Sequence, residues 1–323
     1  MSMKTLRGLL LLALPMALSG CHTVLMSPNG DVALQQRNLI IISFVLMLLI
    51  VVPVLIATLV FAWRYRESNQ KAAYDPDWDH STIIELMIWS APLLIIIALG
   101  AITWVSTHKL DPYRPLDRVS AGKVVPADVK PLEVDVVALD WKWLFIYPEQ
   151  NLAVVNELAA PVDRPIHFNL TASTVMNSFF VPSLAGQIYA MPGMQTTLQA
   201  VMNKPGDYWG FSANYSGAGF SYMNFVFKGM SEDDFNKWVA KAKASGDALD
   251  QATYTKLEAP SQKDPVHYYG SVTPGLYQAI LNRCVQPGPS CMNMLRMSQP
   301  DSGGGEAAAS PDSHAAMPMA HPQ

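Results

Sequence analysis

Hydrophobic residues concentrate in two long segments within the first third of the chain. No charged residue occurs in segment 39–63 or in segment 86–107. An α-helix rises 1.5 Å per residue, so each segment is long enough to cross the ~30 Å hydrocarbon core of a bilayer. The pattern predicts a pair of transmembrane helices over 39–63 and 82–107, joined by loop 64–81.

Beyond residue 131 the apolar residues alternate with polar ones, which is the pattern of a β-strand. Within 132–147 the apolar set changes parity at Leu139, and this change predicts a β-bulge. Further short strands are predicted, with Gly, Pro and Asn between them, over 166–171, 196–202, 207–211 and 223–228. The pattern indicates an antiparallel sandwich or barrel over 132–229, preceded by a proline-containing linker over 108–131.

A helical pattern follows the predicted strands. Ser231 is a good helix N-cap, and Phe235 and Trp238 fall on one helical face. A second helix is predicted to begin at Thr273. These features give a helical extension over 230–292, rich in aromatic residues. Gly, Ala, Ser and Pro dominate the final segment, 293–323, which is predicted to be disordered.

The first twenty residues have the features of a secretory signal peptide. Lys4 and Arg7 precede an apolar run, and Leu18-Ser19-Gly20-Cys21 matches the bacterial lipobox. In that motif the cysteine becomes the lipidated N-terminus. Segment 1–20 is therefore predicted to be removed, leaving a palmitoylated lipoprotein anchored through Cys21; an unprocessed anchor with a chance cysteine is the alternative.

Lipidation at Cys21 also predicts the orientation of the chain. The anchor and segment 21–38 lie outside the bacterial inner membrane, and two crossings return the chain to the same side. Both termini are then periplasmic and loop 64–81 is cytoplasmic. Arg64, Arg66 and Lys71 in that loop agree with the positive-inside preference.

Composition narrows the class of protein. Charged residues make up 15% of the chain, against ~25% in an average soluble protein, as two membrane spans require. A net charge of −4 argues against nucleic acid as a partner. Three cysteines in 323 residues exclude a disulfide-built scaffold.

Several ordered motifs resemble subunit II of haem-copper terminal oxidases. They are Glu85–Pro92, Trp141-Lys142-Trp143, Val175–Leu184, Met191-Pro192-Gly193 and Gly206–Gly210. The resemblance extends over roughly residues 20–290. It implies a fold of membrane α plus all-β type: a two-helix transmembrane hairpin, a periplasmic cupredoxin-like β-sandwich and short C-terminal helices.

The copper-binding motif of that family is degenerate in this chain. Cytochrome c oxidases hold a dinuclear copper centre with the motif Cys-x-Glu-x-Cys-x3-His-x2-Met and a further His on an earlier loop. Thiolate, imidazole and thioether are the donors that suit copper. The matching positions here are Asn177, Ser212, Asn214, Ser216, Phe220 and Met223. Only the methionine is retained, and no cysteine occurs between His22 and Arg283, so no metal is expected in this chain.

Loss of the copper ligands indicates the electron donor. Cytochrome c needs a metal on the outer face to receive its electron, whereas ubiquinol dissolves in the bilayer and reaches a haem directly. The chain therefore resembles subunit II of the cytochrome bo-type ubiquinol oxidases of proteobacteria. That resemblance implies a proton-pumping complex with subunits I, III and IV, two haems and one copper in subunit I, and no catalytic residue in this chain.

The resemblance also suggests roles for single residues. Glu85 at the start of the second span is associated in this family with proton uptake; a first-turn acid that only favours the helix dipole is the alternative. Trp141 and Trp143 mark the strand that takes part in electron input in copper-bearing relatives, and here core packing is the expected role. The polar residues of the degenerate motif are likewise expected to fill the core.

Cys284 and Cys291 remain after Cys21 is lipidated. An oxidising periplasm permits a disulfide between them, and two buried free thiols are the alternative.

Two other functions are alternatives to a ubiquinol oxidase subunit. The first is a cytochrome c oxidase subunit with a copper centre, but this chain lacks the thiolates that such a centre requires. The second is a free-standing lipoprotein for copper handling or sensing, which would need only the tail ligands Met317, Met319, His314 and His321.

Overall fold

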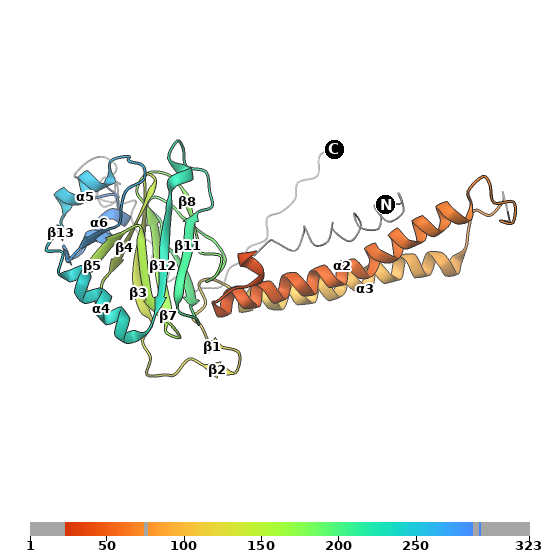
Figure 1. The fold of residues 1–323 in the computed structure, drawn as a ribbon, viewed down its shortest axis with the longest axis horizontal. Helices are drawn as coiled ribbons and strands as arrows, with labels where there is room; N and C mark the ends of the chain where they lie inside the picture. The colour runs from red at the N-terminus through yellow and green to blue at the C-terminus, as the bar shows by residue number, and fades with distance from the viewer. Residues whose placement is uncertain (1–22, 74–76, 287–290, 292–323) are drawn as a thin grey trace, which may run out of the picture.

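The two apolar segments form a helical hairpin that extends from a β-sandwich (Figure 1). The computed structural model describes residues 23–73, 77–286 and 291. A short 3-10 helix, η1 (Val24–Met26), precedes α2 (Asp31–Arg64), which lies beside α3 (Thr82–Lys109). Both helices are long and apolar enough to cross a membrane. Helix α2 begins eight residues before the predicted span, because its first turn packs on the sandwich.

Gly30 connects the membrane hairpin to the sandwich. The backbone N–H groups of Asn29 and Gly30 both donate to the carbonyl of Ser183, at 3.0 and 2.8 Å. A Cβ atom at Gly30 would lie 2.5 Å from the carbonyl oxygen of Leu184, so only glycine fits this crossing. The chain entering α2 is thus fixed against the sandwich.

Two facing sheets make the sandwich. One has the order β10-β7-β3-β4-β5-β14, with bounds Thr196–Val201, Pro165–Ala172, Leu132–Leu139, Lys142–Tyr147, Leu152–Val155 and His267–Tyr269. The other has the order β6-β12-β11-β8-β9, with bounds Glu157–Pro161, Asn224–Met230, Gly206–Ser212, Asn177–Phe180 and Ile188–Ala190. The predicted sandwich is confirmed, although it is not wholly antiparallel: β3 pairs with β7, and β12 with β6, in parallel.

The predicted β-bulge near Leu139 is wrong. Strands β3 and β4 pair in uninterrupted register from Asp135↔Ile146 to Leu139↔Lys142, where a two-residue turn joins them. The apolar parity changes because the turn reverses the chain. Val136 pairs with Phe145 and Ala138 with Trp143, so even positions on β3 and odd positions on β4 face the same core. In addition, β3 is buried on both faces. Val134 and Val136 face the core between the sheets, while Val137 and Leu139 face a second core on the outer side.

The second core lies under the C-terminal segment. Helix α4 (Glu232–Lys243) begins at Ser231, whose hydroxyl accepts a hydrogen bond from the N–H of Asp234. The segment then forms α5 (Gln251–Glu258) and α6 (Leu276–Leu281), with two-stranded pairing of β13 (Ala248–Leu249) and β15 (Ser271–Val272). Helix α6 begins after the turn at Gly275 (φ 78°), rather than at Thr273. The short C-terminal helices are confirmed.

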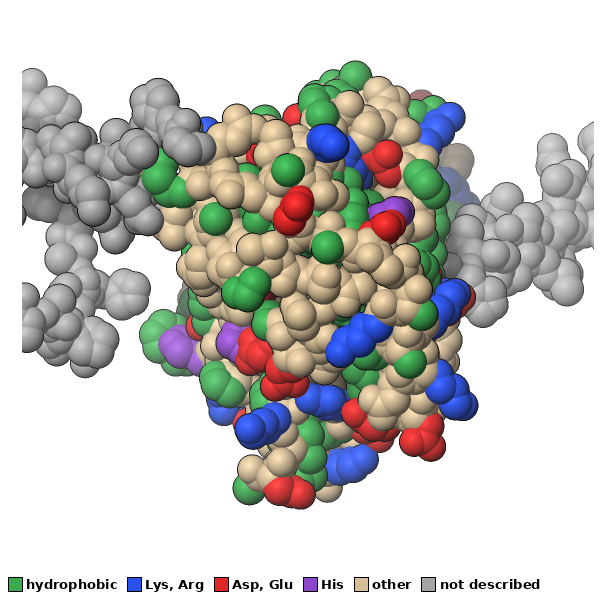
Figure 2. All heavy atoms as spheres, turned by 90° about the vertical axis from the view of Figure 1, so that its left-hand side faces the viewer, with side chains coloured by type: hydrophobic (Ala, Val, Ile, Leu, Met, Phe, Trp, Pro, Cys, Tyr) green, Lys and Arg blue, Asp and Glu red, His purple; other side chains and the backbone are tan. Residues whose placement is uncertain are grey.

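The remaining surfaces differ in character. The linker after α3 carries the small hairpin of β1 (Arg118–Ser120) and β2 (Lys123–Val124). On the face formed by the C-terminal segment, basic and acidic side chains are interspersed and apolar atoms form small, separate patches (Figure 2). Such a surface is typical of contact with water, whereas α2 and α3 leave many large apolar side chains exposed.

Candidate functional site

Asn177 and Ser212 meet at the end of the five-stranded sheet. Asn177 begins β8 and Ser212 ends β11, and their side chains are 1% and 2% exposed. The Ser212 hydroxyl lies 3.1 Å from the Asn177 Oδ1 and 3.2 Å from the Asn214 carbonyl oxygen, so its single proton is shared between two acceptors. The Asn177 amide donates to the Val175 carbonyl at 3.1 Å. Hydrogen bonds thus join the two positions that the motif spacing matches to a histidine and a cysteine of the copper site.

The loop after β11 brings Ser216 and Met223 together. The Ser216 hydroxyl lies 4.0 Å from the Met223 sulfur, and Met223 is buried. Phe220, in the short helix η2 (Phe220–Tyr222), packs edge-on against Tyr215 at 5.6 Å between ring centroids. Asn214 donates to the Met176 carbonyl at 3.2 Å. The structure therefore gathers Asn177, Ser212, Ser216 and Met223, and engages Asn214 and Phe220 in loop contacts.

Trp141 covers this loop and Trp143 lies beneath it. The Trp141 indole N–H donates to the Ser216 carbonyl at 3.0 Å. A Cβ atom at Gly219 would lie 2.4 Å from the Trp141 ring, so the loop needs glycine to approach so closely. Trp143 is fully buried and packs edge-on against Phe179 and Phe225, at 5.5 and 5.8 Å. Both tryptophans contribute to packing.

These residues do not fit a dinuclear copper centre. Such a centre needs two bridging thiolates and two imidazoles, and the pocket offers hydroxyls, amides and one thioether. Within the described ranges, no group of three or more His, Cys, Asp or Glu side chains is placed to hold a metal ion. These donors therefore do not support electron transfer through a copper centre in this domain.

Rebuilding the ligand set tests whether the loops keep the ancestral geometry. The chain carrying Asn177→His, Ser212→Cys, Asn214→Glu, Ser216→Cys and Phe220→His is expected to bind two copper ions and become coloured. Visible absorption and copper content of the purified variant measure this. The matched control carries only the His and Glu changes and is expected to stay colourless, because the bridging thiolates are missing. A colourless five-fold variant would contradict the loop assignment.

Glu85 lies in the first turn of α3, away from the pocket. Its carboxylate lies 2.7 Å from the His80 Nδ1, and the His80 Nε2 lies 3.1 Å from the Thr82 hydroxyl. The Glu85 side chain is 45% exposed. A carboxylate and an imidazole in hydrogen-bond contact can exchange a proton with each other.

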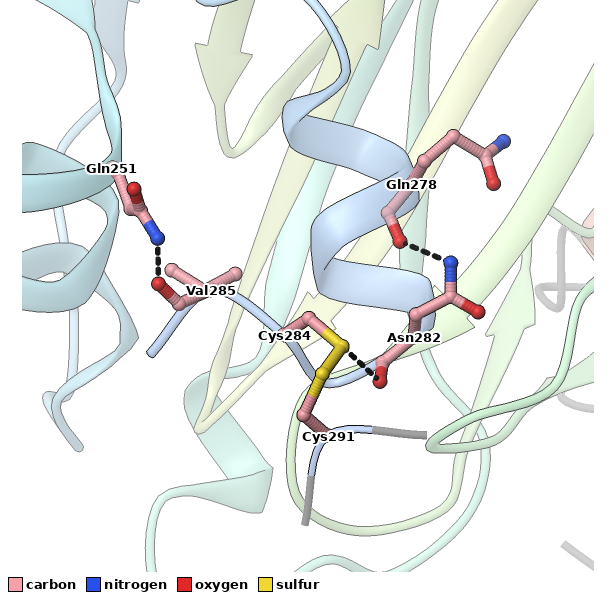
Figure 3. The surroundings of a disulfide bond; sticks show 6 residues. All are labelled: Gln251, Gln278, Asn282, Cys284, Val285 and Cys291. Atoms are coloured by element: carbon pink, nitrogen blue, oxygen red, sulfur yellow. Dashed lines mark hydrogen bonds between the residues drawn. A yellow bond between two sulfur atoms is a disulfide. The ribbon is translucent and has the colours of Figure 1, made fainter. Parts of the chain in front are cut away.

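Cys284 and Cys291 form a disulfide just after α6, with 4.5 Å between their Cα atoms (Figure 3). The Cys284 N–H donates to the Ala279 carbonyl, which ties the bond to the end of the helix. The Gln251 amide donates to the Val285 carbonyl, so the same turn also contacts α5. Cys21 and the tail ligands lie outside the described residues.

Sequence reasoning missed four buried charged residues. Asp31 is 4% exposed and pairs with Arg118, and Lys142 is 2% exposed and lies 3.4 Å from Asp264. Asp135 and Glu157 are 7% and 5% exposed. Their partners lie far away in the sequence, so no local spacing reveals them. For Asp135, Lys142 and Glu157 the available signal was a charged residue inside a strand, because such residues are rarely buried unless they are paired. Asp31, at the start of α2, offered no such signal.

Two protein families and a solved structure match parts of this chain. The family "Cytochrome C oxidase subunit II, periplasmic domain" matches residues 126–230, and "COX Aromatic Rich Motif" matches residues 243–288. The crystal structure of the periplasmic domain of subunit II of cytochrome oxidase of Bradyrhizobium japonicum is 23% identical. The matched region covers 38% of this chain and 99% of the Bradyrhizobium domain, with a TM-score of 0.35.

Full-length relatives match most of the chain. It is 54% identical over 266 residues to "Cytochrome bo(3) ubiquinol oxidase subunit 2" of Pseudomonas putida, covering 82% of each chain. It is 52% identical over 264 residues to "Ubiquinol oxidase subunit 2" of Acetobacter aceti, covering 82% of this chain and 83% of that one. The apolar hairpin, the sandwich and the family matches define the class as subunit II of haem-copper oxidases. Within that class, the chain belongs to the family of cytochrome bo(3) ubiquinol oxidase subunit 2.

Proposed function

We propose that the chain is the non-redox subunit II of a proton-pumping ubiquinol oxidase. Electrons pass from ubiquinol to the haems and copper of subunit I, where oxygen is reduced. The observation that carries this proposal is the pocket itself, in which Met223 is the only ligand type of an electron-accepting copper centre that remains, and a Ser212–Asn177 hydrogen bond stands where a cysteine and a histidine are needed. Without that centre a one-electron protein donor has no acceptor in this chain, whereas a membrane-soluble donor needs none.

The chain serves the complex by covering subunit I on its periplasmic side and by packing its hairpin against membrane partners. Support comes from the apolar side chains that α2 and α3 leave uncovered, including Phe44, Leu55, Leu59, Leu86, Trp89, Leu94 and Ile96. Such surfaces are stable only against lipid or other membrane helices. Subunits III and IV complete the proposed assembly, and the lipid on Cys21 anchors the chain from the periplasmic side.

Co-purification tests this assignment. An affinity-tagged chain isolated in mild detergent is expected to carry a haem-containing partner, seen as haem absorption in proportion to the protein. A free-standing lipoprotein for copper handling would be isolated without haem, and that result would contradict the proposal. A tagged chain with Gly30→Val provides an assembly-deficient comparison, because the new side chain collides with the Leu184 and Val201 carbonyls.

Glu85 is proposed to take up protons at the cytoplasmic side. The variant Glu85→Ala is expected to slow turnover of the purified complex by roughly threefold to tenfold. This is less than the ~10²–10⁴ typical of proton-transfer groups, because water can reach the half-exposed site. Oxygen consumption per haem measures the effect, and haem content should stay unchanged. The matched control is Glu67→Ala in the adjoining loop, and wild-type turnover of the Glu85 variant would refute the role.

A further inference from the structure

A cavity of about 180 Å³ lies where the membrane hairpin meets the sandwich. Its walls are the first turns of α2, the end of α3, the linker over 110–118 and the loop over 186–187. We call it the junction cavity. Lys109 is the last residue of α3, so the cavity lies at the level where a spanning helix leaves the hydrocarbon and meets lipid headgroups.

The charges around the junction cavity balance, and two of the charged groups have no ion-pair partner among the described residues. Three acidic and three basic side chains line it: Asp31, Lys109, Asp111, Arg114, Asp117 and Arg118. The Arg118 guanidinium donates to both oxygens of the buried Asp31, at 2.8 and 3.1 Å. Arg114 pairs with Asp117 at 3.0 Å. Lys109 and Asp111 make no ion pair with any residue that the structure describes. The Asp111 Oδ1 accepts a hydrogen bond from the Tyr113 backbone N–H at 2.9 Å, which leaves its second oxygen open. The Lys109 ammonium and this second carboxylate oxygen therefore remain to meet a ligand that carries both signs.

The remaining walls supply uncharged hydrogen-bonding groups. The amide side chains of Gln36, Gln187 and Gln199 line the same cavity. Amides can donate to phosphate or ester oxygens and can accept from an ammonium group. The volume is below the ~300 Å³ of the smallest common ligand pockets, so the cavity suits a headgroup rather than a whole lipid.

An apolar surface leads from the cavity along α2. Ile40, Phe44 and Met47 follow Gln36 on one helical face, at i+4, i+8 and i+11, and their side chains are 40%, 55% and 50% exposed. Acyl chains of a lipid whose headgroup occupies the cavity can lie along this face. Headgroup site and chain surface are thus continuous.

We propose that the junction cavity binds the headgroup of one phosphatidylethanolamine molecule of the outer leaflet. Lys109 binds the phosphate and Asp111 binds the primary ammonium, which donates hydrogen bonds to it. Phosphatidylglycerol lacks the ammonium group, and the quaternary ammonium of phosphatidylcholine cannot donate a hydrogen bond. The lipid therefore joins the two charges that lack an ion pair and seals the contact between the hairpin and the sandwich.

Native mass spectrometry of the purified, delipidated complex tests this site. The complex is titrated in turn with phosphatidylethanolamine, phosphatidylglycerol and phosphatidylcholine. The wild type is expected to bind one phosphatidylethanolamine at least about tenfold more tightly than the other two lipids. Lys109→Gln and Asp111→Asn are each expected to weaken this event by about tenfold, the effect of losing one charge-assisted hydrogen bond.

Lys123→Gln is the matched control, because Lys123 is exposed, pairs with Asp163 and lies outside the cavity. It should bind phosphatidylethanolamine as the wild type does. Equal affinity in the wild type and both cavity variants would overturn the site. Equal affinity for phosphatidylglycerol and phosphatidylethanolamine would overturn the role of Asp111. Haem content of each variant, measured in parallel, separates loss of lipid from loss of assembly.

Discussion

Replacing Glu157 by glutamine is expected to lower the free energy of unfolding by about 3 kcal/mol. The change breaks a buried ion pair, leaves the Lys228 ammonium without its counter-charge and weakens the hydrogen bonds from Trp238 and Tyr268. Glu157 lies on β6 and is 5% exposed. One carboxylate oxygen accepts hydrogen bonds from the Trp238 indole at 2.8 Å and the Tyr268 hydroxyl at 2.6 Å. The other pairs with the Lys228 ammonium at 2.8 Å.

These contacts join four elements, since Lys228 lies on β12, Trp238 on α4 and Tyr268 on β14. The effect should fall at the lower end of the ~3–5 kcal/mol measured for broken buried pairs, because Lys228 is 34% exposed and can recover some hydration. At about 2–4 °C per kcal/mol, the melting temperature should drop by roughly 6–12 °C. Thermal unfolding of the purified full chain, followed by near-ultraviolet circular dichroism, measures this shift.

The effect of Glu157 should depend on pH in a definite direction. Burial raises the pKa of this carboxyl, but hydrogen bonds from Lys228, Tyr268 and Trp238 outweigh it and bring the pKa below its usual range. A lowered folded-state pKa stabilises the protein above the unfolded pKa, and this stabilisation is lost as pH falls through the folded pKa. Wild type and Glu157→Gln should therefore converge in acid. Glu149→Gln, at an exposed site, should change stability by less than about 0.5 kcal/mol, and an equally small change at Glu157 would contradict the argument.

Replacing Asp135 by asparagine should have the opposite effect, stabilising the chain by up to about 3 kcal/mol at pH 8. Asp135 lies on the outer face of β3, is 7% exposed, and borders a cavity of about 400 Å³ together with Tyr277. Burial, with a smaller contribution from the neighbouring Glu133, raises its pKa to about 6, despite a hydrogen bond from the Asn169 amide at 3.0 Å. Asparagine keeps an oxygen for that hydrogen bond and removes the charge.

The sign of the pH dependence follows from the raised pKa. The unfolded carboxyl titrates near 4, so the folded state binds the proton more tightly than the unfolded state does. Stability from this group is fully present below pH 4 and is lost as pH rises through about 6. Each pKa unit corresponds to about 1.4 kcal/mol, which gives the expected magnitude.

Urea unfolding of the full chain at pH 4 and at pH 8, followed by tryptophan fluorescence, measures the Asp135 effect. The two proteins should be equally stable at pH 4, and Asp135→Asn should be more stable at pH 8. Asp128→Asn in the exposed linker is the control and should match the wild type at both pH values. A destabilised Asp135→Asn at pH 8 would show that the buried charge has a partner that the structure does not include.

The sequence predicts most of the membrane hairpin and the strand positions, because both follow from local periodicity. Segments 39–63 and 82–107 lie within α2 and α3, and α3 exceeds its prediction by only two residues. The early start of α2 could not be predicted, since it depends on contacts of Gly30 and Asp31 with residues more than eighty positions away. Tertiary contacts extended the helix beyond its apolar segment.

The mistaken bulge has two causes. The tight turn at 140–141 places odd positions of β4 on the same face as even positions of β3, and Leu139 is buried on the other face of β3. A strand with two covered faces loses the alternation from which register is normally predicted. The covering segment includes α5 and β14, which were not predicted because they are short and their apolar faces form only against β3–β5. The pairing of Glu157 with β12, α4 and β14 has the same long-range origin.

The loss of the copper ligands could be predicted from the sequence, but the contacts that fill the pocket could not. Residue identities alone show that the thiolates are missing, because donor chemistry depends only on side-chain type. They do not show that the Ser212 hydroxyl contacts Asn177, or that Trp141 closes over Gly219. Those contacts depend on how the β8 and β11 ends meet in space.

Oxygen consumption by the detergent-purified complex, with ubiquinol and with reduced cytochrome c as alternative donors, tests the central claim most directly. A pocket filled by Asn177, Ser212 and Met223 provides no acceptor for a one-electron protein donor. The account predicts rapid oxygen consumption with ubiquinol and none above background with cytochrome c. Activity with cytochrome c alone would contradict it.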